Sequence, residues 1–194
     1  FFRVALVVHV DLSVLVWFAA FGGLLWTLSG GVRALWIERS GLALCSAGAL
    51  LPCPAPFAGS GRAILSNHIP VLDHPLFLAG LVTFGAGALL VVARGLFAGS
   101  RLAATLNGTE ALRFGLGVAA VSAAVSLFAF LWSWLAVPAG LAGRAYFELL
   151  VWGGGRVFEF TLTLLMLCGW VWVAARVRPA LPLHPRGGVG VVSA

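Results

Sequence analysis

Long apolar runs separated by short polar stretches set the pattern of this chain. Five hydrophobic segments can be marked, at about 4–28, 35–57, 75–97, 114–137 and 145–177. A helix needs roughly 20 apolar residues to cross a bilayer, and the first, third, fourth and fifth segments meet that length. The pattern therefore predicts an all-α fold, a polytopic transmembrane bundle of about five spanning helices.

The second segment is the weakest of the five because it contains three prolines, Pro52, Pro54 and Pro56. Proline lacks a backbone donor and its ring clashes with the preceding helical turn. We therefore expect this helix to end or kink near Leu51.

We assign all five segments to one membrane domain at 1–178. Residues 179–194 are rich in proline and glycine and show no periodicity, which predicts a poorly ordered tail. The chain opens at Phe1, without methionine and already at the start of a helix, which predicts a fragment of a larger bundle.

Composition supports the membrane class. Hydrophobic residues make up 61% of the chain, charged residues 9%, and the mean hydropathy is +1.07. A soluble domain carries far more charge. The net charge of +6 comes from arginine, and the arginines lie at segment ends without forming a patch, which argues against nucleic-acid binding. The three cysteines form no C-x-x-C pair, so we expect no disulfide and no metal site from them.

The distribution of arginine predicts the orientation, because positive residues collect on the cytoplasmic side. With five spans, one side receives Arg33, Arg39, Arg94, Arg101, Arg113, Arg176, Arg178 and Arg186, and the other receives Arg3, Arg62 and Arg144. The first side should be cytoplasmic, so the N-terminus should lie outside.

His9 is the first candidate for chemistry. It lies about one and a half turns into the first helix, and a neutral imidazole is a good axial ligand for haem iron. The alternative is a structural histidine that bonds to a neighbouring helix. In both cases we expect His9 to point into the bundle, because an unpaired polar group in hydrocarbon is costly. Asp11, two residues on, should face away from His9 and needs its own partner.

His68, Asp73 and His74 occupy the loop before the third span, which is outside in the predicted orientation. One interpretation is a solvated loop with Asp73 or His74 near a helix start. The other is a lid over the propionates of a cofactor, or a metal contact. The spacing H-x-x-x-x-D-H matches no strong metal signature.

The last span carries charge inside the membrane. Arg156 and Glu159 are one helical turn apart, and Glu148 lies a little over two turns before Arg156. Glycines 153–155 remove side chains where another backbone or a flat cofactor could come close. Charged groups at this depth usually face a bundle interior, so we expect Arg156 to point inward and meet Glu159, Glu148 or a propionate. The pair either holds the bundle together or lines a polar pocket.

Three stretches resemble the catalytic subunit I of the haem-copper oxidase superfamily, which includes cytochrome c oxidases and nitric oxide reductases. H-V-D-L-S-V-L-V-W-F-A-A-F-G-G, from His9, is similar to the family's second helix. N-H-I-P-V-L-D-H-P resembles the loop between its third and fourth helices, and Y-F-E-L-L-V-W-G-G-G-R-V-F-E-F resembles its sixth. The chain would then cover helices two to six.

The resemblance implies that His9 ligates a haem b iron and that Arg156 lies at the cofactor. It departs from the family at Arg156, where the relatives carry a copper-binding histidine. Since a guanidinium offers no lone pair to a metal, we do not expect copper. The implied function is a haem-binding respiratory subunit of the bacterial cytoplasmic membrane, in contact with other respiratory subunits or a cytochrome c-type donor. Whether it is an active oxidoreductase stays open.

The alternative is a non-catalytic or transport-type membrane protein, in which Arg156 and Glu159 bind an anion or relay protons. A haem spectrum that depends on His9 would distinguish the two hypotheses.

Overall fold

The fold is an all-α bundle with one small hairpin, described by a computed structural model over residues 2–29, 35–58, 61–65, 69–98 and 108–177. The elements are α1 (Phe2–Val10), a π-helical turn (Asp11–Val16), α2 (Trp17–Ser29), α3 (Leu35–Leu50), β1 (Arg62–Ile64), β2 (Val71–Asp73), α4 (Pro75–Ala98), α5 (Gly108–Ala136) and α6 (Gly143–Val177). The predicted tail at 179–194 lies outside the described residues.

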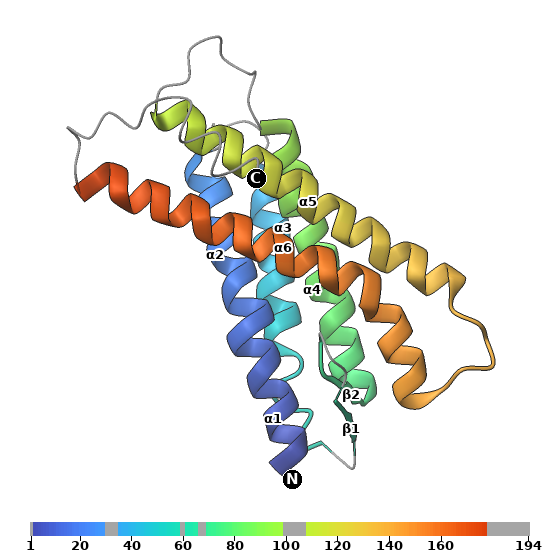
Figure 1. Cartoon of the computed structure of the whole chain (residues 1–194). Helices are drawn as coiled ribbons and strands as arrows, with labels where there is room; N and C mark the ends of the chain where they lie inside the picture. The colour runs from blue at the N-terminus through green and yellow to red at the C-terminus, as the bar shows by residue number, and fades with distance from the viewer. Residues whose placement is uncertain (1, 30–34, 59–60, 66–68, 99–107, 178–194) are drawn as a thin grey trace.

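The helices form two groups (Figure 1). The continuous rod from α1 to α2 runs beside α3 and α4, and the long hairpin of α5 and α6 crosses them obliquely. Four helices in the described ranges are long and apolar enough to span a membrane: Phe2–Leu28, Pro75–Phe97, Ala111–Ala136 and Gly143–Ala174. The protein is therefore a multi-pass membrane protein.

The helix α3 lies beside α4 and is short (Figure 1). Its 16 residues span only about 24 Å, less than the hydrocarbon core of roughly 30 Å. The helix ends at Leu50, as its prolines predicted, and the chain continues in tight turns in which Cys53 N donates to Leu50 O at 3.1 Å and Phe57 N to Pro54 O at 2.9 Å. A short helix followed by turns thus replaces the expected second spanning helix.

Glycine allows α3 and α4 to pack backbone against backbone. A Cβ at Gly48 would lie 2.3 Å from Phe84 N, and one at Gly87 would lie 2.5 Å from Cys45 N and 2.7 Å from Gly41 O. Gly48 also meets Gly80, so residues later in α3 contact residues earlier in α4. The two helices are therefore antiparallel and in close contact over two helical turns.

Hydroxyl groups join α5 to α6. Ser126 Oγ donates to Gly154 O at 2.7 Å, and the hydroxyls of Ser122 and Thr161 are 2.8 Å apart. A Cβ at Gly154 would lie 2.5 Å from the ring of Phe130. The missing side chain at Gly154 thus makes room for an aromatic ring of α5, where the sequence had suggested another backbone or a flat cofactor.

The described residues form two apolar cores. One joins α2, α4, α5 and α6 and includes Trp26, whose Nε1 donates to Leu116 O at 2.9 Å. The other lies at the N-terminal end, where Val71 and Leu72 of the hairpin pack against Val7 and Phe77. The antiparallel strands pair Arg62 with Asp73 and Ile64 with Val71. The hairpin therefore closes the end of the bundle at which α1 begins (Figure 1).

Candidate functional site

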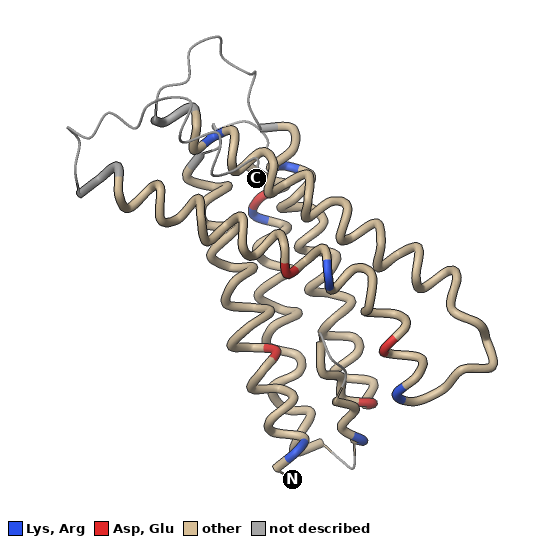
Figure 2. The backbone as a smooth tube through the Cα atoms, in the orientation of Figure 1, with Lys and Arg blue, Asp and Glu red and all other residues tan. Residues whose placement is uncertain are grey.

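Charged residues are sparse along the chain, and a few lie in the middle parts of the helices (Figure 2). Charge inside a membrane is costly and usually marks function or a close pairing. The candidate site is therefore built from these groups and from the histidines.

Glu38 and Arg94 form a buried ion pair near the start of α3 and the end of α4. Arg94 Nη2 lies 2.8 Å from Glu38 Oε2, and both side chains are less than a tenth exposed. Arg94 lies near the C-terminal end of α4, within the predicted third span, and its burial in an ion pair was not predicted. The seven-residue spacing of glycines in both helices could have indicated that α3 and α4 pack together. Gly41 and Gly48 of α3 meet Gly87 and Gly80 of α4, which sets an antiparallel register.

Asp11 is a second buried charge and opens the π-helical turn. It is 6% exposed, and its Oδ2 has no hydrogen-bond partner among the residues that the structure describes. Within the same turn Ser13 Oγ donates to His9 O at 2.6 Å. Wide turns of this kind occur frequently at functional sites. The sequence predicted that Asp11 faces away from His9 but not that it would be buried.

His9 lies about 10 Å along the helix from its start at Phe2. Its side chain is exposed on the outside of the bundle, so our expectation that it points inward is wrong for this chain. Its imidazole makes no hydrogen bond to any described group, because the one contact at this residue is to its backbone oxygen. The imidazole is thus free to bind a partner from outside.

Arg156 and Glu159 are also exposed, on the outer face of α6, so the expected inward orientation of Arg156 is wrong. Glu148 pairs instead with Arg144, whose Nε lies 2.6 Å from Glu148 Oε1. Arg156 lies about 20 Å along α6 from Gly143. The guanidinium therefore faces outward, near the middle of the candidate span Gly143–Ala174.

Three polar residues were predicted as candidates in the loop before α4, and the structure gives one of them, His74, a structural role. His74 precedes α4, and its Nδ1 accepts a hydrogen bond from Leu76 N at 3.2 Å, which caps the helix. Asp73 is exposed at the end of β2. His68 lies outside the described residues. Over the described part of the chain, no three His, Cys, Asp or Glu side chains gather as metal ligands would.

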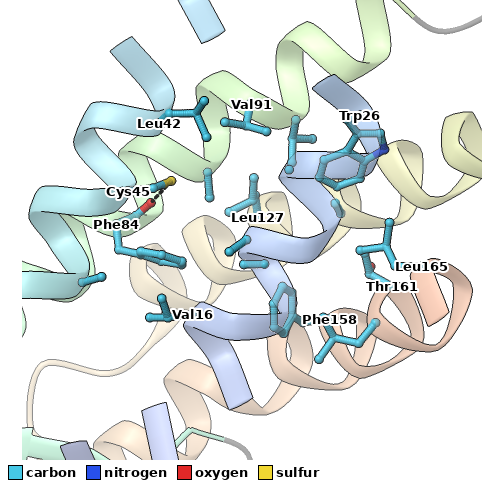
Figure 3. A pocket seen from close by; sticks show the side chains of 18 of the residues that line it. Val16, Trp26, Leu42, Cys45, Phe84, Val91, Leu127, Phe158, Thr161 and Leu165 are labelled. Atoms are coloured by element: carbon cyan, nitrogen blue, oxygen red, sulfur yellow. Dashed lines mark hydrogen bonds between the residues drawn. The ribbon is translucent and has the colours of Figure 1, made fainter. Parts of the chain in front are cut away.

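A cavity of about 420 Å³ lies inside the bundle, bounded by α2 to α6 (Figure 3). Its walls, which belong to described residues, contain no histidine or methionine, and the thiol of Cys45 is directed at Phe84 O at 3.7 Å. A haem in this cavity would find no imidazole ligand. A haem bound by His9 must therefore lie against the outside of α1.

Comparison with known proteins adds two relatives. An uncharacterized protein of Rickettsia prowazekii (strain Madrid E), RP382, is 25% identical over an alignment 205 positions long, which covers 88% of this chain and 38% of that protein. An uncharacterized protein of Aquifex aeolicus (strain VF5) is 25% identical over 179, covering 91% of this chain and 44% of that protein. No protein-family model and no solved structure matches. The chain thus spans less than half the length of these curated relatives.

Proposed function

We propose that this chain is the haem-ligating part of a respiratory membrane protein related to haem-copper oxidases, acting in the bacterial cytoplasmic membrane. The observation that carries the proposal is the exposed imidazole of His9, without a hydrogen bond among the described residues, in the apolar span Phe2–Leu28. An unpaired polar group in hydrocarbon is costly, and coordination to iron satisfies it.

The haem would lie between the outer face of α1 and a second membrane surface. That surface is needed because His9 offers one axial ligand and no enclosing wall. Both relatives are more than twice as long as the part they share with this chain, which is consistent with further helices in such proteins. Both come from bacteria, which agrees with the proposed membrane.

The chain's own contribution would be to hold and orient the cofactor. His9 would bind the iron as a neutral imidazole, and the bound haem would supply one-electron transfer, with electrons arriving from a cytochrome c-type donor or another respiratory subunit. Arg156 stands where the resembled family has a copper ligand. Its guanidinium binds anionic groups and not metals, so the proposal includes no copper centre.

The test is a reduced-minus-oxidised spectrum of membranes that contain the protein. We expect a haem b signal that is lost in His9→Ala and kept in His74→Ala, which removes another histidine from a helix cap outside the membrane span. Equal amounts of protein in the membrane must be shown by immunoblot. A signal unchanged by His9→Ala, or no haem at all in the wild type, would contradict the proposal.

A further inference from the structure

The cavity inside the bundle has an apolar floor. Trp26, Val91, Val92, Ala123 and Leu165 line its deep side, and all five are buried. Figure 3 shows Val91, Leu127 and Phe158 among the side chains that surround the space. The volume of about 420 Å³ is in the range of small-molecule sites. Protein interiors rarely contain empty spaces of this size, so we infer that another molecule fills the cavity.

The polar groups in its buried walls are already engaged, and the remaining one, Ser46, is exposed at the mouth. Trp26 Nε1 donates to Leu116 O, the Cys45 thiol is directed at Phe84 O, and the Thr161 hydroxyl contacts Ser122 and Val157 O. Water needs two to four polar partners to occupy a cavity, and an apolar space stays dry. The walls therefore favour hydrocarbon over water or any polar ligand.

The mouth of the cavity faces lipid. Its exposed lining residues are Ala20 on α2 and Leu42, Ser46 and Leu50 on α3, whereas those from α4, α5 and α6 are buried or half-buried. Position 20 lies well within the span Phe2–Leu28, about 12 Å along the helix from its end at Leu28. The opening between α2 and α3 therefore leads sideways into the hydrocarbon of the bilayer.

We propose that this cavity binds one hydrocarbon chain of a membrane lipid, which enters between α2 and α3 while its headgroup stays outside. Small residues make the α2 wall smooth enough for a linear chain, namely Ala19, Ala20 and Gly23. Phospholipid acyl chains and isoprenoid tails share this chemistry, and the experiment distinguishes them. The site is independent of a haem at His9.

Gly23→Leu is the variant that fills the site. A Cβ at Gly23 meets only Val91 Cγ1, at 3.8 Å, so the added side chain has room to enter the cavity without a clash. Gly85→Leu is the matched control. A Cβ there has nothing within 4 Å, and Gly85 does not line the cavity.

Trp26 reports occupancy, because its ring lines the cavity and is only 7% exposed to surrounding lipid. Purified protein is titrated with a phospholipid brominated near the ends of its acyl chains and, in a second arm, with a brominated polyisoprenoid alcohol. The fluorescence lost from Trp26 is the difference between each protein and the same protein carrying Trp26→Phe. Quenching in one arm alone identifies the type of chain.

We expect saturable quenching of Trp26 in the wild type and in Gly85→Leu. In Gly23→Leu the midpoint should rise by roughly tenfold or more, since each buried methylene displaced is worth a factor of about four in affinity. Equal midpoints in Gly23→Leu and Gly85→Leu, or no quenching of wild-type Trp26 by either lipid, would overturn the proposal. Circular dichroism of each variant confirms that its helices are intact.

Discussion

Among single residues, Asp11 is buried without an interaction that explains its burial. One of its carboxyl oxygens has no partner among the described residues, although the side chain is 6% exposed. Burying an unsatisfied polar group costs about 1–3 kcal/mol.

Asp11→Leu should therefore stabilise the protein. We expect the free energy of unfolding to rise by roughly 1–3 kcal/mol, because the desolvation cost disappears while the branched shape of the side chain is kept. Tryptophan fluorescence during thermal unfolding in detergent measures this change, with eight tryptophans as the signal. A loss of stability would mean that Asp11 has a partner that stabilises the fold.

The ion pair between Glu38 and Arg94 should behave in the opposite way. Removing one member of a buried pair typically costs 3–5 kcal/mol, because the other charge is left without compensation. We expect a loss of about that size for Glu38→Leu, and recovery of most of it when Arg94→Met is added. The same unfolding assay tests both proteins. If the double variant is no more stable than Glu38→Leu, then Arg94 is not the group that Glu38 compensates.

The sequence showed how far along each span the charged residues lie, but not which side of the helix they occupy. His9 and Arg156 were expected to point inward on the ground that polar groups avoid lipid. Both helices are apolar on every side, so no hydrophobic stripe marks the inner face. Adjacent helical residues point about 100° apart, and only the packing of neighbouring helices decides which residue is covered. Burial of Asp11 and exposure of His9 could therefore not be derived from spacing.

At the scale of elements, the α3–α4 pair should depend on its glycines. Gly48→Leu would drive a side chain into the backbone of Phe84, so we expect the helices to separate at a cost of about 1–3 kcal/mol or more. Gly85→Ala, on the outer side of the same pair, should be neutral or stabilise α4 by up to about 1 kcal/mol. Thermal unfolding of the two variants distinguishes them. Equal losses would show that close approach is not what these glycines provide.

Element boundaries were predicted where one residue decides them. Pro52 ended α3 near Leu51 because proline acts locally. The strands β1 and β2 and the π-helical turn were not predicted. Three-residue strands need a partner found only in the folded loop, and the turn at Asp11–Val16 has no proline or glycine to mark it. The glycines 153–155 were predicted to let another group approach α6 closely. The ring of Phe130, which meets Gly154, was not identified as that group.

For the whole molecule, the arginine distribution predicts that the hairpin and the N-terminus lie outside. Arg94 no longer counts, since it belongs to a buried pair, but the remaining excess keeps its sign. In a background with Cys45, Cys53 and Cys168 replaced by alanine, Arg62→Cys should react with a membrane-impermeant maleimide in intact cells. Arg113→Cys, at the opposite end, should react only after permeabilisation. The reverse pattern would invert the topology.

Composition and segment length were enough to predict a helical membrane bundle, because a bilayer requires long apolar helices. They could not predict how α5 and α6 cross the other helices. The outer faces carry large exposed side chains such as Trp132, Trp152 and Trp170. Lipid and protein solvate such groups almost equally well, so nothing in the sequence distinguishes a face that meets lipid from one that meets another helix.

The glycine contacts between α3 and α4 have a consequence for how the chain enters the membrane. Whether the translocation channel releases a segment into the bilayer depends on the length and charge of that segment. On its own, α3 is too short and carries Glu38 into hydrocarbon, so it should be rejected and slip back. Delivered together with α4, it brings its carboxylate to Arg94 and hides its backbone against Gly87. We therefore expect the two helices to partition as a preassembled unit, with α3 waiting at the channel until α4 has been synthesised.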